Sequence, residues 1–159
     1  MSKKIAVNTL RVFFLTMLLT APAMGQVKPN FSGTWKQNNA KSKLAPGAPI
    51  WVHKIEQKSA VLKVETTVTG GHGMSKRENT YTTDGKKQIT KDRGGDSLTQ
   101  SVEWEGNTLV FLTVEKEGTH TFTSREVWAL SNDGKTLVKT LHLAGPHGVT
   151  DQKYVYDKQ

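Results

Sequence analysis

Polar side chains that could do chemistry share one face of a predicted β-strand with large apolar side chains. Successive side chains of a strand point to opposite sides, so the even-numbered positions of residues 119–130 lie on one face. That face carries three apolar and three polar side chains: Phe122, Trp128, Leu130, His120, Ser124 and Glu126. Arg125 has the opposite parity, and we expect it to face solvent. If the apolar residues face a core, then His120, Ser124 and Glu126 are candidate ligand-binding residues.

Glu126 is the most informative of these positions. A carboxylate inside a protein costs free energy unless it is paired or hydrated. An inward Glu126 therefore predicts either a polar, water-filled cavity or an ion pair. A bulge in the strand would instead shift the register and turn Glu126 toward solvent. The sequence leaves both outcomes open.

Two tyrosines near the C-terminus are further candidates. Tyr154 and Tyr156 are two residues apart in a predicted strand, 149–157, so they share a face. We expect them to line the same hollow as the polar residues of the strand 119–130.

Histidines could supply a metal site. The chain contains five: His53, His72, His120, His142 and His147. Zinc needs three or four imidazole, thiolate or carboxylate ligands that converge. Two of the histidines fall in predicted turns, and the other three fall in strands that become neighbours only in one particular register. Metal binding is thus an alternative without assigned ligands.

Motifs of catalysis are not found. The sequence has no G-x-S-x-G, no H-E-x-x-H and no cysteine. Residues 70–73, G-G-H-G, are glycine-rich, but no helix is expected after them, so they indicate a hairpin and not a phosphate loop. No two residues can be assigned as the general acid and the general base of a reaction. We therefore predict a protein that is not an enzyme and has no cofactor.

The elements that must position these residues are short strands. From residue 50 onward, β-branched and aromatic residues alternate with turn residues, and no window shows a helical apolar period. Asp84-Gly85 is a strong hairpin signal. The predicted strands are 31–37, 50–58, 60–69, 75–83, 86–91, 98–105, 108–116, 119–130, 136–143 and 149–157.

A chain of this kind predicts an all-β fold. Long open sheet edges invite aggregation, so a meander of about eight to ten strands favours an antiparallel up-and-down β-barrel. A two-sheet sandwich is the second possibility. Residues 38–49 are predicted to form a loop with at most one helical turn, around residues 39–43.

The first predicted strand carries a recognisable motif. Residues 30–36 contain N-F-S-G-T-W-K, residues 128–137 contain W-A-L-S-N-D-G-K-T-L, and residues 155–158 contain V-Y-D-K. These segments resemble the calycins, the lipocalins and fatty-acid-binding proteins, in the form of small secreted lipocalin-like bacterial proteins. The resemblance implies Gly33 at the barrel closure, Trp35 as a plug of one end, and a basic side chain across Trp35, either Lys153 or Lys158.

The chain departs from fatty-acid-binding proteins in two ways. The segment 38–49 is too short and too rich in proline for the helical lid of that family. The family commonly ends with an R-x-Y pair that binds the ligand carboxylate, whereas here Tyr154 stands where the arginine would precede Tyr156. A carboxylate clamp is therefore absent or built from other residues. The helix that follows the barrel in true lipocalins is also not predicted.

The N-terminal residues predict export. Lys3, Lys4 and Arg11 precede an apolar run, 12–19, that is shorter than the ~20 residues of a membrane span. Small residues at 21–25 allow cleavage after Ala23 or after Gly25, and we favour Gly25. Residues 1–25 are therefore predicted to be a cleaved signal peptide and 26–159 a single domain. We expect a secreted or periplasmic protein with no membrane anchor.

The formal net charge of +8 is distributed over turns and strand exteriors. Nucleic-acid binders gather such charges on one face, so we predict no nucleic-acid partner. The leading hypothesis is a monomeric binding protein for a small lipophilic, apolar or amphipathic molecule. The alternatives are a structural or interaction barrel with a filled core, and the histidine-based metal binder.

Overall fold

The protein is a ten-stranded, all-β structure in a computed structural model that describes residues 27–44, 47–70, 73–91 and 94–159. The predicted signal peptide and His72 lie outside the described residues. The strands are β1 (Gly33–Gln37), β2 (Ile50–Lys58), β3 (Val61–Gly70), β4 (Gly73–Thr82), β5 (Gln88–Lys91), β6 (Ser97–Glu105), β7 (Thr108–Glu117), β8 (His120–Leu130), β9 (Thr136–Gly145) and β10 (Gly148–Lys158).

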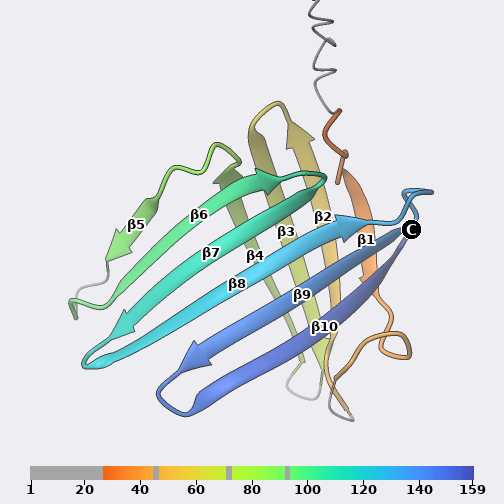
Figure 1. The fold of residues 1–159 in the computed structure, drawn as a ribbon. Helices are drawn as coiled ribbons and strands as arrows, with labels where there is room; N and C mark the ends of the chain where they lie inside the picture. The colour runs from red at the N-terminus through yellow and green to blue at the C-terminus, as the bar shows by residue number, and fades with distance from the viewer. Residues whose placement is uncertain (1–26, 45–46, 71–72, 92–93) are drawn as a thin grey trace, which may run out of the picture.

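All ten strands belong to one antiparallel sheet in the order β4-β3-β2-β1-β10-β9-β8-β7-β6-β5. The first strand pairs with the last, with Trp35 opposite Lys158. The sheet curls so that β2–β4 cross behind β6–β10 (Figure 1). The predicted up-and-down meander is therefore confirmed in the form of a curled half-barrel, and the single continuous sheet is not a two-sheet sandwich.

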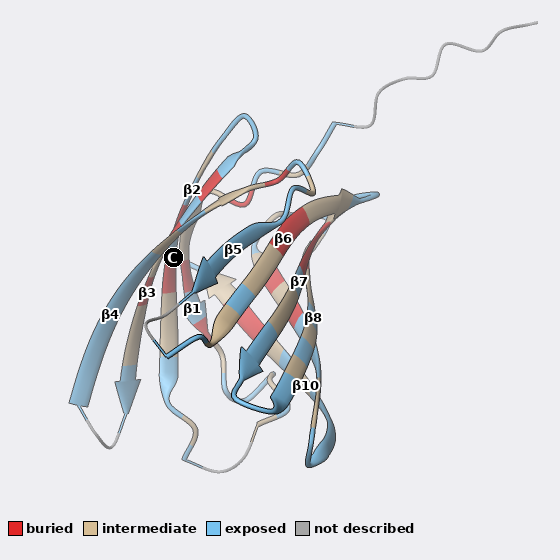
Figure 2. Cartoon of the chain, turned by 90° about the vertical axis from the view of Figure 1, so that its left-hand side faces the viewer, coloured by how far each residue is buried: buried red, intermediate tan, exposed pale blue. Residues whose placement is uncertain are grey.

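The two edges of the sheet are β4 and β5. They follow each other in the chain, but the described residues show no ladder between them. A single backbone bond, from the Gly85 N–H to the Val102 carbonyl at 2.9 Å, ties the connecting turn to β6. Buried residues gather in the middle strands, whereas β4 and β5 are mostly exposed (Figure 2).

The core is the concave face of this sheet. Its fully buried large side chains include Phe31, Trp35, Ile55, Leu62, Leu109, Leu137 and Tyr156. Trp35 has no exposed surface, and its indole N–H donates a hydrogen bond to the Phe31 carbonyl at 2.8 Å. The indole thus buries its apolar body and satisfies its single polar group. Residues 38–44 and 47–49, the described part of the segment between β1 and β2, contain turns and no helix.

The basic residue that covers Trp35 is Lys158. Its Nζ lies 5.2 Å from the centre of the Trp35 ring. Lys153 does not take this role, which corrects the assignment of Lys153 as part of the structural signature. The physical reason is strand parity: Lys158 shares the inward face of Tyr156, whereas Lys153 lies on the opposite face.

Gly33 is required by its backbone. It has a φ of +142°, a conformation that side chains rarely adopt, and an added Cβ would lie 2.8 Å from Cε of Lys158. The nearest neighbours of Gly33 at this closure are therefore side-chain atoms and not another backbone segment.

Candidate functional site

A cavity lies inside the curled sheet. It measures about 280 Å³, close to the ~300 Å³ at which ligand pockets begin. Six strands contribute to its wall: β2, β3, β4, β8, β9 and β10. The lining side chains are Trp51, His53, Val64, Thr66, Arg77, Asn79, Tyr81, Ser124, Glu126, Trp128, Lys139, Leu141, Tyr154 and Tyr156. Aromatic rings therefore make up much of a wall that also holds several polar groups.

The polar centre of the cavity is an ion pair between β8 and β9. Nζ of Lys139 lies 3.7 Å from Oε1 of Glu126, and the lysine side chain is only 5% exposed. The same carboxylate oxygen accepts a hydrogen bond from the indole N–H of Trp128 at 2.8 Å. Glu126 thus points inward and is paired. The ladder between β7 and β8 runs without a break through this position, so the alternative of a bulge does not occur.

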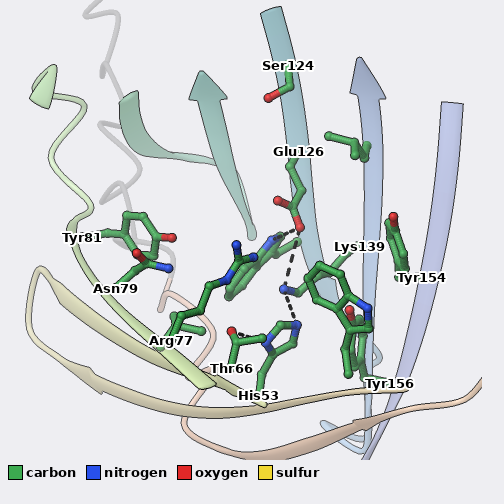
Figure 3. A pocket seen from close by; sticks show the side chains of 14 residues that line it. His53, Thr66, Arg77, Asn79, Tyr81, Ser124, Glu126, Lys139, Tyr154 and Tyr156 are labelled. Atoms are coloured by element: carbon green, nitrogen blue, oxygen red, sulfur yellow. Dashed lines mark hydrogen bonds and ion pairs between the residues drawn. The ribbon is translucent and has the colours of Figure 1, made fainter. Parts of the chain in front are cut away.

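His53 extends the network across the cavity to β2 and β3. Nζ of Lys139 lies 3.0 Å from Nε2 of His53, and Nδ1 of His53 lies 2.9 Å from the hydroxyl of Thr66 (Figure 3). A lysine ammonium can only donate, so Nε2 accepts and Nδ1 carries the proton that is donated to Thr66. The chain of contacts fixes one neutral tautomer of the imidazole.

Burial and charge shift the pKa values of these groups. Burial, followed by the nearby Lys139 and Arg77 charges, lowers the pKa of His53 to about 2. Burial lowers the pKa of Lys139 to about 8, because Glu126 offsets only part of the desolvation. Burial also raises the pKa of Tyr156, of Tyr81 and of Tyr154. At neutral pH the imidazole and the phenols are therefore uncharged.

Lys139 is held between aromatic rings. Its Nζ lies 3.6 Å from the centre of the Trp128 ring and 5.2 Å from that of Tyr156. A cation close to a ring face is attracted by the ring quadrupole, most strongly when it is desolvated. The rings and the Glu126 carboxylate together keep a buried cation in place.

Arg77 lies at the rim. It comes from the edge strand β4, is exposed, and stacks over Trp51 with its Cζ 5.5 Å from the ring centre. Among the described residues no carboxylate forms a salt bridge with its guanidinium. The wall therefore carries two cations, Arg77 and Lys139, against one carboxylate, Glu126, which favours a negative charge inside the cavity.

The structure brings four of the five predicted ligand-binding residues around this cavity: Ser124, Glu126, Tyr154 and Tyr156. His120 does not join them. It shares their face by parity but pairs with Glu117 at the β7–β8 hairpin, where its side chain is exposed. Parity fixes the side to which a residue points but not its depth along the strand, which is why His120 lies at the exposed hairpin and not at the cavity. Arg125 faces outward, as predicted, and pairs with Glu105 at 2.6 Å.

Sequence reasoning missed the cationic half of the site: His53, Arg77 and Lys139. For Lys139 a signal was present, because it alternates with Leu137 and Leu141, which the sequence places on one inward face. For His53 the signal is that it alternates with Trp51 and Ile55, so that the three side chains share one face of the strand.

The described residues hold no cluster of three or more histidine, aspartate or glutamate side chains with the spacing of a metal site. His53 is occupied by Thr66 and Lys139, and His142 pairs with Asp151 at 2.8 Å. Within the same residues no helix is long and apolar enough to span a membrane.

Comparison with known proteins identifies the fold. No protein-family model and no curated protein matches the chain. Among solved structures, secretory abundant heat soluble protein 4 from Ramazzottius varieornatus matches with a TM-score of 0.60 and 15% identity, over 81% of this chain and 94% of that one. The REP1-NXSQ fatty acid transporter matches with a TM-score of 0.57 and 11% identity, over 81% of this chain and 96% of that one. Lipid binding protein 8 from Caenorhabditis elegans matches with a TM-score of 0.55 and 16% identity, over 81% of this chain and 95% of that one.

These neighbours are barrels of the fatty-acid-binding and lipocalin-like type, so the fold implied by the N-terminal motif is confirmed. At such low identity the likeness concerns the fold alone. The bacterial and secreted part of the resemblance stays a prediction.

Proposed function

We propose that this protein binds a small amphipathic molecule whose apolar part packs against the aromatic wall and whose polar end carries a negative charge. The observation that carries the proposal is the hollow of about 280 Å³ in which aromatic rings surround an excess of positive charge. Ligand pockets commonly combine an apolar wall with a few placed polar groups. A structural barrel with a filled core is less well supported, since Trp51, Tyr154 and Tyr156 leave this space open.

The anion partner in the proposal is Arg77. Lys139 already has Glu126 as its counter-ion, whereas Arg77 projects from β4 over the Trp51 ring and forms no salt bridge with a carboxylate of the described residues. Arg77 thus stands in for the R-x-Y pair that the terminal strand lacks. The neighbours named as a fatty acid transporter and a lipid binding protein support the class of ligand.

Binding is tested with three probes of equal chain length: decanoate, decanol and decylamine. We expect decanoate to bind most tightly in calorimetry, with a change in the fluorescence of Trp51 and Trp128. A charge-assisted hydrogen bond contributes about 1.5–3 kcal/mol, so Arg77→Gln should weaken decanoate binding at least about tenfold and leave decanol binding unchanged. Arg125→Gln, on the outer face, is the matched control. Tightest binding of decylamine, or no binding of any probe, would contradict the proposal.

Export is the second part of the proposal, motivated by the basic start, the short apolar run and the small residues at 21–25. Expression of the full chain in a bacterium with a general secretion system should yield a processed protein outside the cytoplasm. Its mass should correspond to a chain that begins at Gln26. A protein that keeps Met1 to Gly25 after export to the periplasm, or that stays in the cytoplasm, would exclude a cleaved signal peptide.

A further inference from the structure

The amine of Lys139 belongs to the wall of the cavity. Lys139 lies in the middle of β9, paired on one side with Trp128 and on the other with Tyr154. Its Nζ lies in the cavity wall between Glu126 and His53 (Figure 3). Two flanking ladders hold the backbone of β9, and the contacts with Glu126, His53 and the Trp128 ring hold the amine.

We propose that Lys139 captures the carbonyl group of an amphipathic aldehyde as an imine inside this cavity. The inference rests on the proposed function only in that the aldehyde must enter the same cavity. Besides binding an anionic amphiphile without a covalent bond, the cavity would then bind an aldehyde covalently and select it by its carbonyl group.

The reaction balances without a further reagent. The lone pair of the neutral amine forms a bond to the carbonyl carbon while the carbonyl π electrons move to oxygen, and a proton passes from nitrogen to that oxygen to give a carbinolamine. The carbon–oxygen bond then breaks, the oxygen leaves as water with one added proton from solvent, and the nitrogen lone pair forms the C=N bond. The product is a protonated imine and one water molecule, and no oxidation or reduction takes place.

The environment of Lys139 supplies a reactive amine at neutral pH. With a pKa of about 8, roughly a tenth of the Lys139 side chains are neutral at pH 7, against fewer than about one in a thousand for an ordinary lysine. The neutral amine can donate one N–H to Nε2 of His53, at 3.0 Å, which leaves its lone pair free to face the cavity.

The same environment stabilises the product. A protonated imine keeps the positive charge of the lysine, and the Glu126 carboxylate lies 3.7 Å away as its counter-ion. The face of Trp128, 3.6 Å from Nζ, favours that cation as well. The other titratable or charged side chains that line the cavity are His53, Arg77, Tyr81, Glu126, Tyr154 and Tyr156. Of these only Arg77 repels it as a fixed charge.

The proposal is tested by reductive trapping. The purified protein is incubated with decanal and sodium cyanoborohydride at pH 7, and the product is analysed by intact mass spectrometry and peptide mapping. We expect one addition at Lys139, equal in mass to the aldehyde less its oxygen, because the two hydrogens supplied by reduction replace the two lost in the water released on imine formation. Labelling there should be at least tenfold faster than at Lys54, an exposed lysine on the outer face of β2 that serves as internal reference. The ratio should grow smaller toward pH 10, as the exposed lysines become neutral.

Variants and a non-reactive analogue complete the design. Lys139→Arg keeps the charge but cannot form an imine, and should lose the selective addition. Lys54→Arg should keep it. Because the first measurement uses the unaltered protein, a variant that fails to fold does not decide the outcome. Labelling of Lys139 no faster than Lys54 overturns the proposal. If decanoate binds but decanal is not captured, the imine is excluded and binding of an anionic amphiphile stands; if neither decanoate nor decanal binds, both proposals fail.

Discussion

Replacing Trp35 by alanine should lower the free energy of unfolding by about 3–5 kcal/mol, the range found when a buried large aromatic side chain is removed. Trp35 is completely buried where the first and last strands meet, and its loss removes both the apolar contacts and the hydrogen bond from its indole N–H to Phe31. Urea unfolding followed by circular dichroism measures the change. The transition should move to much lower urea while its slope stays the same.

Trp104→Ala is the matched control, since Trp104 is a partly buried indole that packs at the edge of the same core. We expect less than half the loss seen for Trp35→Ala. Lys158→Ala should cost no more than about 1 kcal/mol, because an exposed cation over a ring contributes little. Equal losses for the two tryptophan variants would mean that Trp35 does not seal the end of the sheet.

The strands could be predicted because their signals are local. Alternation with a period of two and turn dipeptides such as Asp84-Gly85 lie within a few residues, and the predicted strand limits differ from the structure by only a residue or two at most ends. The gap between β4 and β5 could not be predicted. It depends on whether two hairpins that are adjacent in the chain also become adjacent in the sheet, which the curl of all ten strands decides.

The candidate site was half predictable for a related reason. Glu126 was recognisable because one carboxylate among Phe122, Trp128 and Leu130 conflicts with an apolar face. That conflict predicts a partner but does not name it. Lys139 becomes the partner only through the register in which Trp128 lies opposite Lys139, so that Glu126 and Lys139 are diagonal neighbours. His53 joins the network from β2, across the cavity. The spacing of residues in the sequence does not predict that His53 and Lys139 come into contact.

The register also explains why the buried charges are tolerated. Lys139 has a counter-ion, two aromatic faces and a hydrogen-bond acceptor, and the acceptor is available only while His53 stays neutral. A protonated His53 would place two donors and two positive charges 3.0 Å apart in a buried site. The state of the histidine therefore controls the stability of the whole polar network.

Acid should consequently destabilise the protein through His53. Its pKa is 6.5 when unfolded and about 2 when folded, so below pH 6.5 the unfolded chain takes up a proton that the folded one refuses. The stabilisation that the neutral His53 contributes is complete above pH 6.5 and is lost progressively as the pH falls toward 2. By pH 4 the loss should be about 3 kcal/mol. Urea unfolding at pH 7, 6, 5 and 4 measures it, and this range lies below the titration of Lys139.

His53→Gln isolates the contribution of this one group. The amide can accept a hydrogen bond from Lys139 and donate one to Thr66, but it does not titrate in this range. The variant should therefore be less stable than the unaltered protein at pH 7, and its free energy of unfolding should change less between pH 7 and pH 4. The difference in free energy of unfolding between the two proteins should therefore shrink by about 3 kcal/mol over that interval. His142→Gln, which removes an exposed imidazole paired with Asp151, should follow the unaltered protein. Parallel curves for the unaltered protein and His53→Gln would show that His53 is not held neutral by the network.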